Sequence, residues 1–318
     1  MSTVALEEVG LSHNGQIEVI PLPHALGAEV RCGDVKAIDD ATAAVVHRAL
    51  LDNLVILIRD QELTDEDQLD FARHFGVLRP GSKPEESPKG MKARTNPYIG
   101  INSNIKENGV PIGQFGDKEV VWHTDHSYRE IPLSYSVLYG TLAPERGGET
   151  GFCNMYLALE TLPEATRERI KGLSIKNDAA YNSGGQLRGN QKPPGDIRTS
   201  PGPNHPIVCT HPKTGYNALY LGRRPFAYVN GLTLEDSEAL LDELWAHATK
   251  PEFQWHHKWR EGDILMWDNR AVMHHRNAIP PGQDRIAKRC QLDGDPTTCD
   301  PAAFAKPPHP RGYLNVQD

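Results

Sequence analysis

Short apolar runs separated by turns rich in proline and glycine make up most of the chain from Leu133 onward. The runs have the length of strands, and the 25 prolines and 28 glycines of the chain supply the turns between them. This pattern predicts a strand-rich protein. The strands that we expect are Tyr135–Leu142, Thr150–Met155, His205–Thr210, Asn217–Gly222, Phe253–Trp259, Asp263–Trp267, Ala271–His275 and Arg285–Leu292.

Helical signals occur in fewer segments, which indicates an α+β fold with a mainly β core and flanking helices. Helices are expected over residues 38–51 and 158–171, and after two capping-box patterns, Thr64 with Asp67 and Thr233 with Asp236. The apolar residues that share one face of the first helix are Ile38, Ala41, Val45 and Ala49. Strands are also expected at Ile17–Ile20 and Leu54–Ile58.

The composition limits the class of protein. The chain has 318 residues with no convincing internal boundary, so we expect a single domain over residues 1–318, with its core at about 30–295. A net charge of −8 argues against nucleic acid or an anionic membrane as a partner. Five cysteines without C-x-x-C spacing, and an acidic N-terminus without a signal peptide, predict a cytoplasmic protein.

One long segment, residues 79–120, differs from the rest of the chain. It is rich in proline, glycine, lysine and asparagine and has almost no apolar periodicity. Loops of this length in a compact domain are usually either functional lids or disordered. Both interpretations stay open from the sequence.

The chemistry is suggested by the stretch Trp122-His123-Thr124-Asp125. His123 and Asp125 are two positions apart, so in an extended segment they point to the same side and can reach one metal ion. His274 supplies a candidate third ligand, because two imidazoles and one carboxylate form the facial triad of non-haem Fe(II) oxygenases. Its neighbour His275 competes for this role, but adjacent strand residues face opposite sides. Arg289 follows fifteen residues after His274. A buried arginine can bind a carboxylate through two hydrogen bonds, so Arg289 is a candidate carboxylate ligand.

In these motifs the sequence resembles the taurine dioxygenase / 2,4-dichlorophenoxyacetate dioxygenase (TauD/TfdA) family. The matching stretches, in the family's order, are Trp122–Asp125, Gly147–Thr150, His205–Gly215, His247–Phe253, Trp267–His274 and Arg285–Arg289. The resemblance implies a double-stranded β-helix, or jelly roll, and a dimer or tetramer. It implies that His123, Asp125 and His274 bind the metal, and that Thr150 and Arg289, with Arg285 nearby, contact 2-oxoglutarate.

The reaction that the resemblance implies uses Fe(II), 2-oxoglutarate and O₂. An unactivated C–H of a small organic acid is hydroxylated, with release of succinate and CO₂. The carboxylate of Asp125 favours hydroxylation or desaturation, since halogenating relatives replace it. We expect an aryloxyalkanoate-like or sulfonate-like substrate, and taurine itself is disfavoured. The residues expected to line its pocket are Asn102, Ser103, Ile105, Tyr128 and Arg223 or Arg224.

Two other interpretations remain open. A hydrolase could hold Zn²⁺ on His123, Asp125 and either His126 or His274, with a metal-bound hydroxide as the nucleophile. A jelly-roll binding module without enzymatic activity is the third possibility. Only the oxygenase requires Thr150 and Arg289 at their positions in the sequence.

Overall fold

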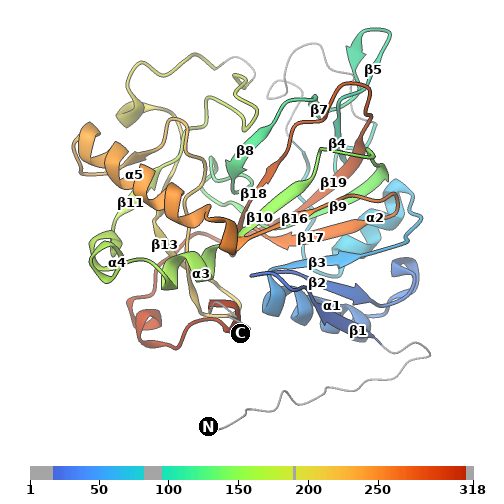
Figure 1. Cartoon of the computed structure of the whole chain (residues 1–318), viewed down its shortest axis with the longest axis horizontal. Helices are drawn as coiled ribbons and strands as arrows, with labels where there is room; N and C mark the ends of the chain where they lie inside the picture. Colours follow the sequence, from blue (N-terminus) through green and yellow to red (C-terminus); the bar gives the residue numbers. More distant parts are fainter. Residues whose placement is uncertain (1–16, 82–94, 189–190, 313–318) are drawn as a thin grey trace.

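The computed structural model describes residues 17–81, 95–188 and 191–312, and they form a mostly-β α+β fold (Figure 1). The larger sheet has eight strands in the order β1-β2-β3-β17-β9-β19-β4-β7. Their bounds are β1 Glu18–Pro21, β2 Ala28–Arg31, β3 Val55–Ile58, β17 Ile264–Asp268, β9 Leu133–Leu142, β19 Ile286–Asp293, β4 Gly100–Ser103 and β7 Gln114–Phe115. Strands β1, β3, β9, β17 and β19 confirm expected strands, whereas β2, β4 and β7 were not expected.

A second sheet of four strands has the order β16-β10-β18-β8. Its strands are β16 Gln254–His257, β10 Thr150–Asn154, β18 Val272–Arg276 and β8 Val120–His123. The two sheets pack through aromatic side chains, with the ring centroids of Phe152 and Trp267 5.5 Å apart. Strand alternation places Trp267 in this interior and its neighbour Met266 on the opposite face of the large sheet.

Helices α1 (Asp40–Asn53) and α2 (Asp65–Arg73) cover the outer face of the large sheet (Figure 1). The capping box of Thr64 and Asp67 is present at the start of α2. The predicted face of α1 is correct at Ala49 and wrong at Ala41, which is exposed; the buried residues are Ala43, Val46, Ala49, Leu50 and Asn53. In an alanine-rich helix several faces are similarly apolar, so the sequence does not fix which one is buried. The face that packs against the large sheet is the one that becomes buried.

The remaining helices lie on the other side of the molecule (Figure 1). The single helix expected over residues 158–171 is instead two helices, α3 (Met155–Glu160) and α4 (Glu164–Ile170), with Pro163 at the N-cap of the second. Proline ends a helix because it lacks an N–H donor and clashes with the preceding turn. Helix α5 (Leu234–Ala248) follows the second capping-box pattern as expected, and it buries Leu241, Leu244, Trp245 and Ala248 while Leu234 is exposed.

Short sheets complete the fold beside these helices. The strand expected over His205–Thr210 is divided into two strands, of which β13 (Val208–Thr210) pairs with β14 (Asn217–Leu219) in an antiparallel hairpin. A three-stranded sheet contains β12 (Asn204–Pro206), β11 (Ser174–Lys176) and β15 (Tyr228–Val229). Among the residues that the structure describes, no helix has the length and apolarity to span a bilayer.

The segment 79–120 contains more regular structure than its sequence indicates. Strands β4 and β7 extend the large sheet, and β5 (Lys106–Glu107) pairs with β6 (Val110–Pro111) in a small hairpin. Residues 82–94 lie outside the described part, so the lid role of this segment stays a prediction. Strand β4 pairs with β19, which brings the segment next to the candidate site.

Gly151 in β10 is needed because histidine rings pack against it from both neighbouring strands. A Cβ atom at this position would overlap with the ring of His275 and come within 2.8 Å of His256. We expect Gly151→Ala to lower the free energy of unfolding by about 1–3 kcal/mol through overpacking. A urea titration would measure the change. Gly195→Ala is the control, since no heavy atom lies within 4 Å of its Cβ; equal stability of the two variants would contradict this assignment.

Candidate metal centre and adjoining pockets

His123, Asp125 and His274 come together on the inner side of the four-stranded sheet. His123 and His274 are direct partners across β8 and β18, and their ring centroids are 4.2 Å apart. Asp125 Oδ1 lies 3.5 Å from Nε2 of His123 and 3.9 Å from Nε2 of His274. All three side chains are buried, and one ligand atom from each falls within 4.8 Å of the others.

The local electrostatics suit a cation at this point. Burial would raise the pKa of Asp125, but the charge of Arg289 and the two imidazoles hold it well below its usual range. Burial, with His123 beside it, lowers the pKa of His274 well below its usual value. An ionised carboxylate and neutral imidazoles are the forms that bind metal. His123 Nδ1 lies 2.8 Å from the carbonyl of Val121, an acceptor that fixes the proton on Nδ1 and leaves Nε2 as a ligand.

The competing histidines lie elsewhere. The His275 ring points to the opposite face of the sheet, where it packs on Trp122 with ring centroids 4.1 Å apart. His126 is buried in the turn after β8 and adopts a left-handed φ of 55°. His126 lines, next to Tyr128, the pocket that we call the outer pocket below. In the described part of the chain, the group of potential metal ligands does not include His126.

An inner pocket next to His274 contains a buried arginine. Arg285 is 2% exposed, and its Nε and Nη1 atoms have no hydrogen-bond partner. Its guanidinium carbon lies 5.2 Å from the ring centroid of Trp259, and the indole of Trp259 donates to Oγ1 of Thr150 at 3.0 Å. Burial lowers the pKa of Arg285, as does the charge of Arg276. An unpartnered buried guanidinium is costly, so this pocket is suited to an anion.

Arg289 is on β19, and Arg285 directly precedes this strand; both line the inner pocket, and Arg289 contacts the candidate metal ligand Asp125. Its Nη1 is 3.2 Å from Oδ1 and 3.4 Å from Oδ2 of Asp125. It lines both the inner pocket and the larger outer one. The structure therefore brings Thr150, Arg285 and Arg289 to one region but gives the two arginines different surroundings.

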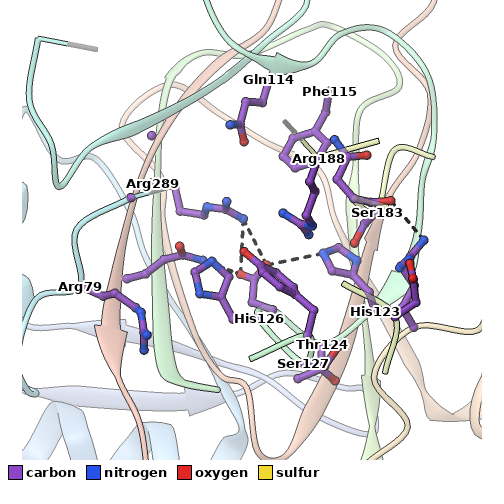
Figure 2. A pocket seen from close by; sticks show the side chains of 18 of the residues that line it. Arg79, Gln114, Phe115, His123, Thr124, His126, Ser127, Ser183, Arg188 and Arg289 are labelled. Carbon is purple, nitrogen blue, oxygen red and sulfur yellow. Dashed lines mark hydrogen bonds and ion pairs between the residues drawn. The ribbon is translucent and has the colours of Figure 1, made fainter. Parts of the chain in front are cut away.

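The outer pocket is lined by His123 and Asp125 and combines aromatic rings with arginines (Figure 2). Arg188 and Arg289 both point into it, and the Arg188 guanidinium lies 3.6 Å from the ring centroid of Tyr128. Arg223 pairs with the buried Asp178 at 2.9 Å. The sequence did not single out Arg188, because it lies in a polar loop without any periodic pattern.

The predicted substrate residues divide into three groups. Tyr128 and Arg223 line the outer pocket, whereas Asn102 lines the inner pocket beside Arg285. Ser103 is buried and accepts a hydrogen bond from the Ile105 amide, and neither residue lines these two pockets. Arg224 instead pairs with Glu238 and Asp242 of α5.

Two imidazoles and one carboxylate on the inner side of a β-sheet, beside a pocket suited to an anion, define a metalloprotein of the two-histidine-one-carboxylate class. The chain matches the family model "Taurine catabolism dioxygenase TauD, TfdA family" over residues 18–291. It therefore belongs to this family.

Individual relatives agree with the family match. The α-ketoglutarate-dependent 2,4-dichlorophenoxyacetate dioxygenase of Cupriavidus pinatubonensis is 32% identical over 263 residues, which cover 80% of this chain and 90% of the relative. The (S)-phenoxypropionate/α-ketoglutarate-dioxygenase of Sphingobium herbicidovorans is 29% identical, covering 88% and 96% of the two chains. The structure of AAD-2 in complex with Mn(II) and N-oxalylglycine has a TM-score of 0.73 at 28% identity, covering 89% of this chain and 99% of that one. These relatives do not support the zinc-hydrolase interpretation.

Proposed function

We propose that this protein is an Fe(II)- and 2-oxoglutarate-dependent dioxygenase that hydroxylates an unactivated C–H of a small organic acid. In the overall reaction, substrate, 2-oxoglutarate and O₂ give hydroxylated product, succinate and CO₂. The observation that carries the proposal is the buried cluster of His123, Asp125 and His274 next to the buried, unpartnered Arg285. We also propose that the two packed sheets form a double-stranded β-helix and that the chain acts as one catalytic domain.

The donor set fits Fe(II). Two neutral imidazole nitrogens and one carboxylate oxygen are the ligands of the facial triad, which leaves the remaining positions open for the co-substrates. When bound, the metal supplies the activation of O₂, and 2-oxoglutarate supplies two of the electrons needed. The protein contributes the burial of these three ligands and their fixed relative positions.

We assign the carboxylate site of 2-oxoglutarate to Arg285 and Thr150. Arg285 has two unpartnered guanidinium atoms in the inner pocket, and Thr150, which accepts the Trp259 indole N–H, keeps its hydroxyl proton for a ligand. This assignment exchanges the roles expected from the sequence, where Arg289 held the carboxylate and Arg285 lay nearby. Arg289 is instead assigned to the substrate side, because it also lines the outer pocket.

The outer pocket favours an anionic substrate with an apolar or aromatic body. Among its lining residues, Tyr98, Phe115 and Tyr128 supply aromatic surface, and Arg188 and Arg289 supply positive charge. Arginine binds carboxylate and sulfonate groups through its planar array of donors. Aryloxyalkanoic acids are therefore our first choice of substrate, and alkyl sulfonates are the second.

Metal replacement tests the proposed function. Metal-free protein should form succinate from 2-oxoglutarate only after Fe(II) is added, and faster when a substrate from a panel of aryloxyalkanoates and alkyl sulfonates is present. Zn(II) should give none, since zinc has no redox chemistry. Succinate is measured by chromatography. Absence of iron-dependent succinate across the panel would reject the dioxygenase function, and hydrolysis with Zn(II) would favour the hydrolase.

The resemblance to the family also leads us to propose a homo-oligomer. Light scattering of the purified protein measures its mass directly and distinguishes a dimer or tetramer from a monomer.

A further inference from the structure

One oxygen of Asp125 is surrounded by hydrogen-bond donors from the large sheet. Oδ2 accepts the hydroxyl of Ser136 at 2.8 Å and the side-chain amide of Gln291 at 3.0 Å. Ser136 on β9 and Gln291 on β19 are direct cross-strand partners, so the sheet presents both donors side by side. Ser136 is fully buried and Gln291 is 7% exposed. These are the two shortest hydrogen bonds to Oδ2, since the third donor, Nη1 of Arg289, lies 3.4 Å away.

The direction of the hydrogen bond from Ser136 is fixed by a chain of buried groups. The Trp267 indole can only donate, and it donates to Oδ1 of Asn269 at 3.0 Å. The Asn269 amide then donates to the Ser136 hydroxyl at 3.1 Å. The hydroxyl therefore donates its own hydrogen bond to Oδ2 of Asp125. Because Trp267 and Asn269 are 1% and 0% exposed, water does not compete for these bonds.

The other oxygen of Asp125 faces the histidines. The nearest approach of each imidazole Nε2 to the carboxylate is to Oδ1, at 3.5 Å and 3.9 Å. The Arg289 guanidinium contacts both oxygens, 3.2 Å from Oδ1 and 3.4 Å from Oδ2. The two oxygens of the carboxylate therefore have different surroundings. Oδ2 accepts hydrogen bonds from the sheet, and Oδ1 is oriented toward the candidate metal position.

We infer that Ser136 and Gln291 are positioning residues that restrict Asp125 to metal binding through Oδ1 alone. Without them, the carboxylate can rotate and bind the metal with both oxygens. A second carboxylate oxygen would occupy one of the three positions that a facial triad leaves open. The inference rests on the proposed function, which requires all three positions for the two-atom chelate of 2-oxoglutarate and for O₂.

Binding of Mn(II) tests, without catalytic turnover, whether Asp125 binds the metal through one oxygen or through both. The protein is saturated with Mn(II) in the absence of 2-oxoglutarate, and water-proton relaxivity reports the number of water molecules on the metal. We expect the double variant Ser136→Ala/Gln291→Leu to lose about one third of the inner-sphere relaxivity, because two open positions remain in place of three. Each single variant should lose less. Circular dichroism checks that the variants are folded, and if the double variant is not, Ser136→Ala alone decides.

Ser134→Ala is the matched control. Ser134 is on the same strand as Ser136, but its hydroxyl donates to the Asp293 carbonyl at 2.8 Å instead of to Asp125. We expect this control to keep the relaxivity of the unmodified protein. A folded, Mn(II)-saturated Ser136→Ala or double variant with unchanged relaxivity would overturn the inference. Failure of the proposed function is a separate result, since it would appear as absence of succinate in the unmodified protein whatever the relaxivity shows.

Discussion

His274→Ala is expected to abolish iron-dependent succinate formation and to weaken metal binding severely. The variant removes one of three ligands from a buried site, which leaves the Asp125 carboxylate and His123 with an incomplete donor set. The loss should exceed the roughly 10–100-fold effect that follows removal of an outer-shell partner of a metal ligand. Equilibrium dialysis with Mn(II) measures the affinity, and a succinate assay with Fe(II) measures activity.

His275→Ala provides the control for this prediction. The two histidines are adjacent on β18, but the ring of His275 lies on the opposite face of the sheet against Trp122 and His256. Its removal should reduce stability through lost packing and leave Mn(II) affinity within a few-fold of the unmodified protein. If His275→Ala lost the metal and His274→Ala kept it, the assignment of the third ligand would be reversed.

Arg285→Ala is expected to raise the KM for 2-oxoglutarate by about 30-fold or more. Removing one partner of a buried, hydrogen-bonded charge pair costs roughly 2–5 kcal/mol, and each 1.4 kcal/mol corresponds to a factor of ten. Arg285 is buried in the inner pocket, which Thr150, Trp267 and Leu138 also line. Steady-state kinetics at saturating substrate, with 2-oxoglutarate varied, give the measurement.

Arg289→Ala separates the two possible assignments of the arginines. Arg289 lies four residues after Arg285, next to Asp125, and lines the outer pocket as well as the inner one. We expect the variant to raise mainly the KM for the organic acid, with a smaller effect on the KM for the co-substrate. The opposite division, with Arg289→Ala raising the KM for 2-oxoglutarate more than Arg285→Ala does, would restore the roles expected from the sequence.

Several errors in the predicted fold have local physical causes. Pro163 lay inside the helix predicted over 158–171, and its effect on helices was visible in the sequence. Strands β4 and β7 lack an apolar alternation, because their place in the sheet depends on main-chain pairing with β19 and with each other. The register of such short segments cannot be inferred from side-chain pattern alone.

The sequence by itself determined the strand-rich class, most strand positions and the local pair His123 and Asp125. These features depend on alternation with a period of two, which is a property of neighbouring residues. Only the tertiary structure decided that His274 is paired with His123 across β8 and β18, and that Ser136 and Gln291 hold Oδ2 of Asp125. It also gave Arg285 and Arg289 different surroundings. The reason is that strand pairing joins segments far apart in the chain, and the resulting contacts are fixed by sheet register.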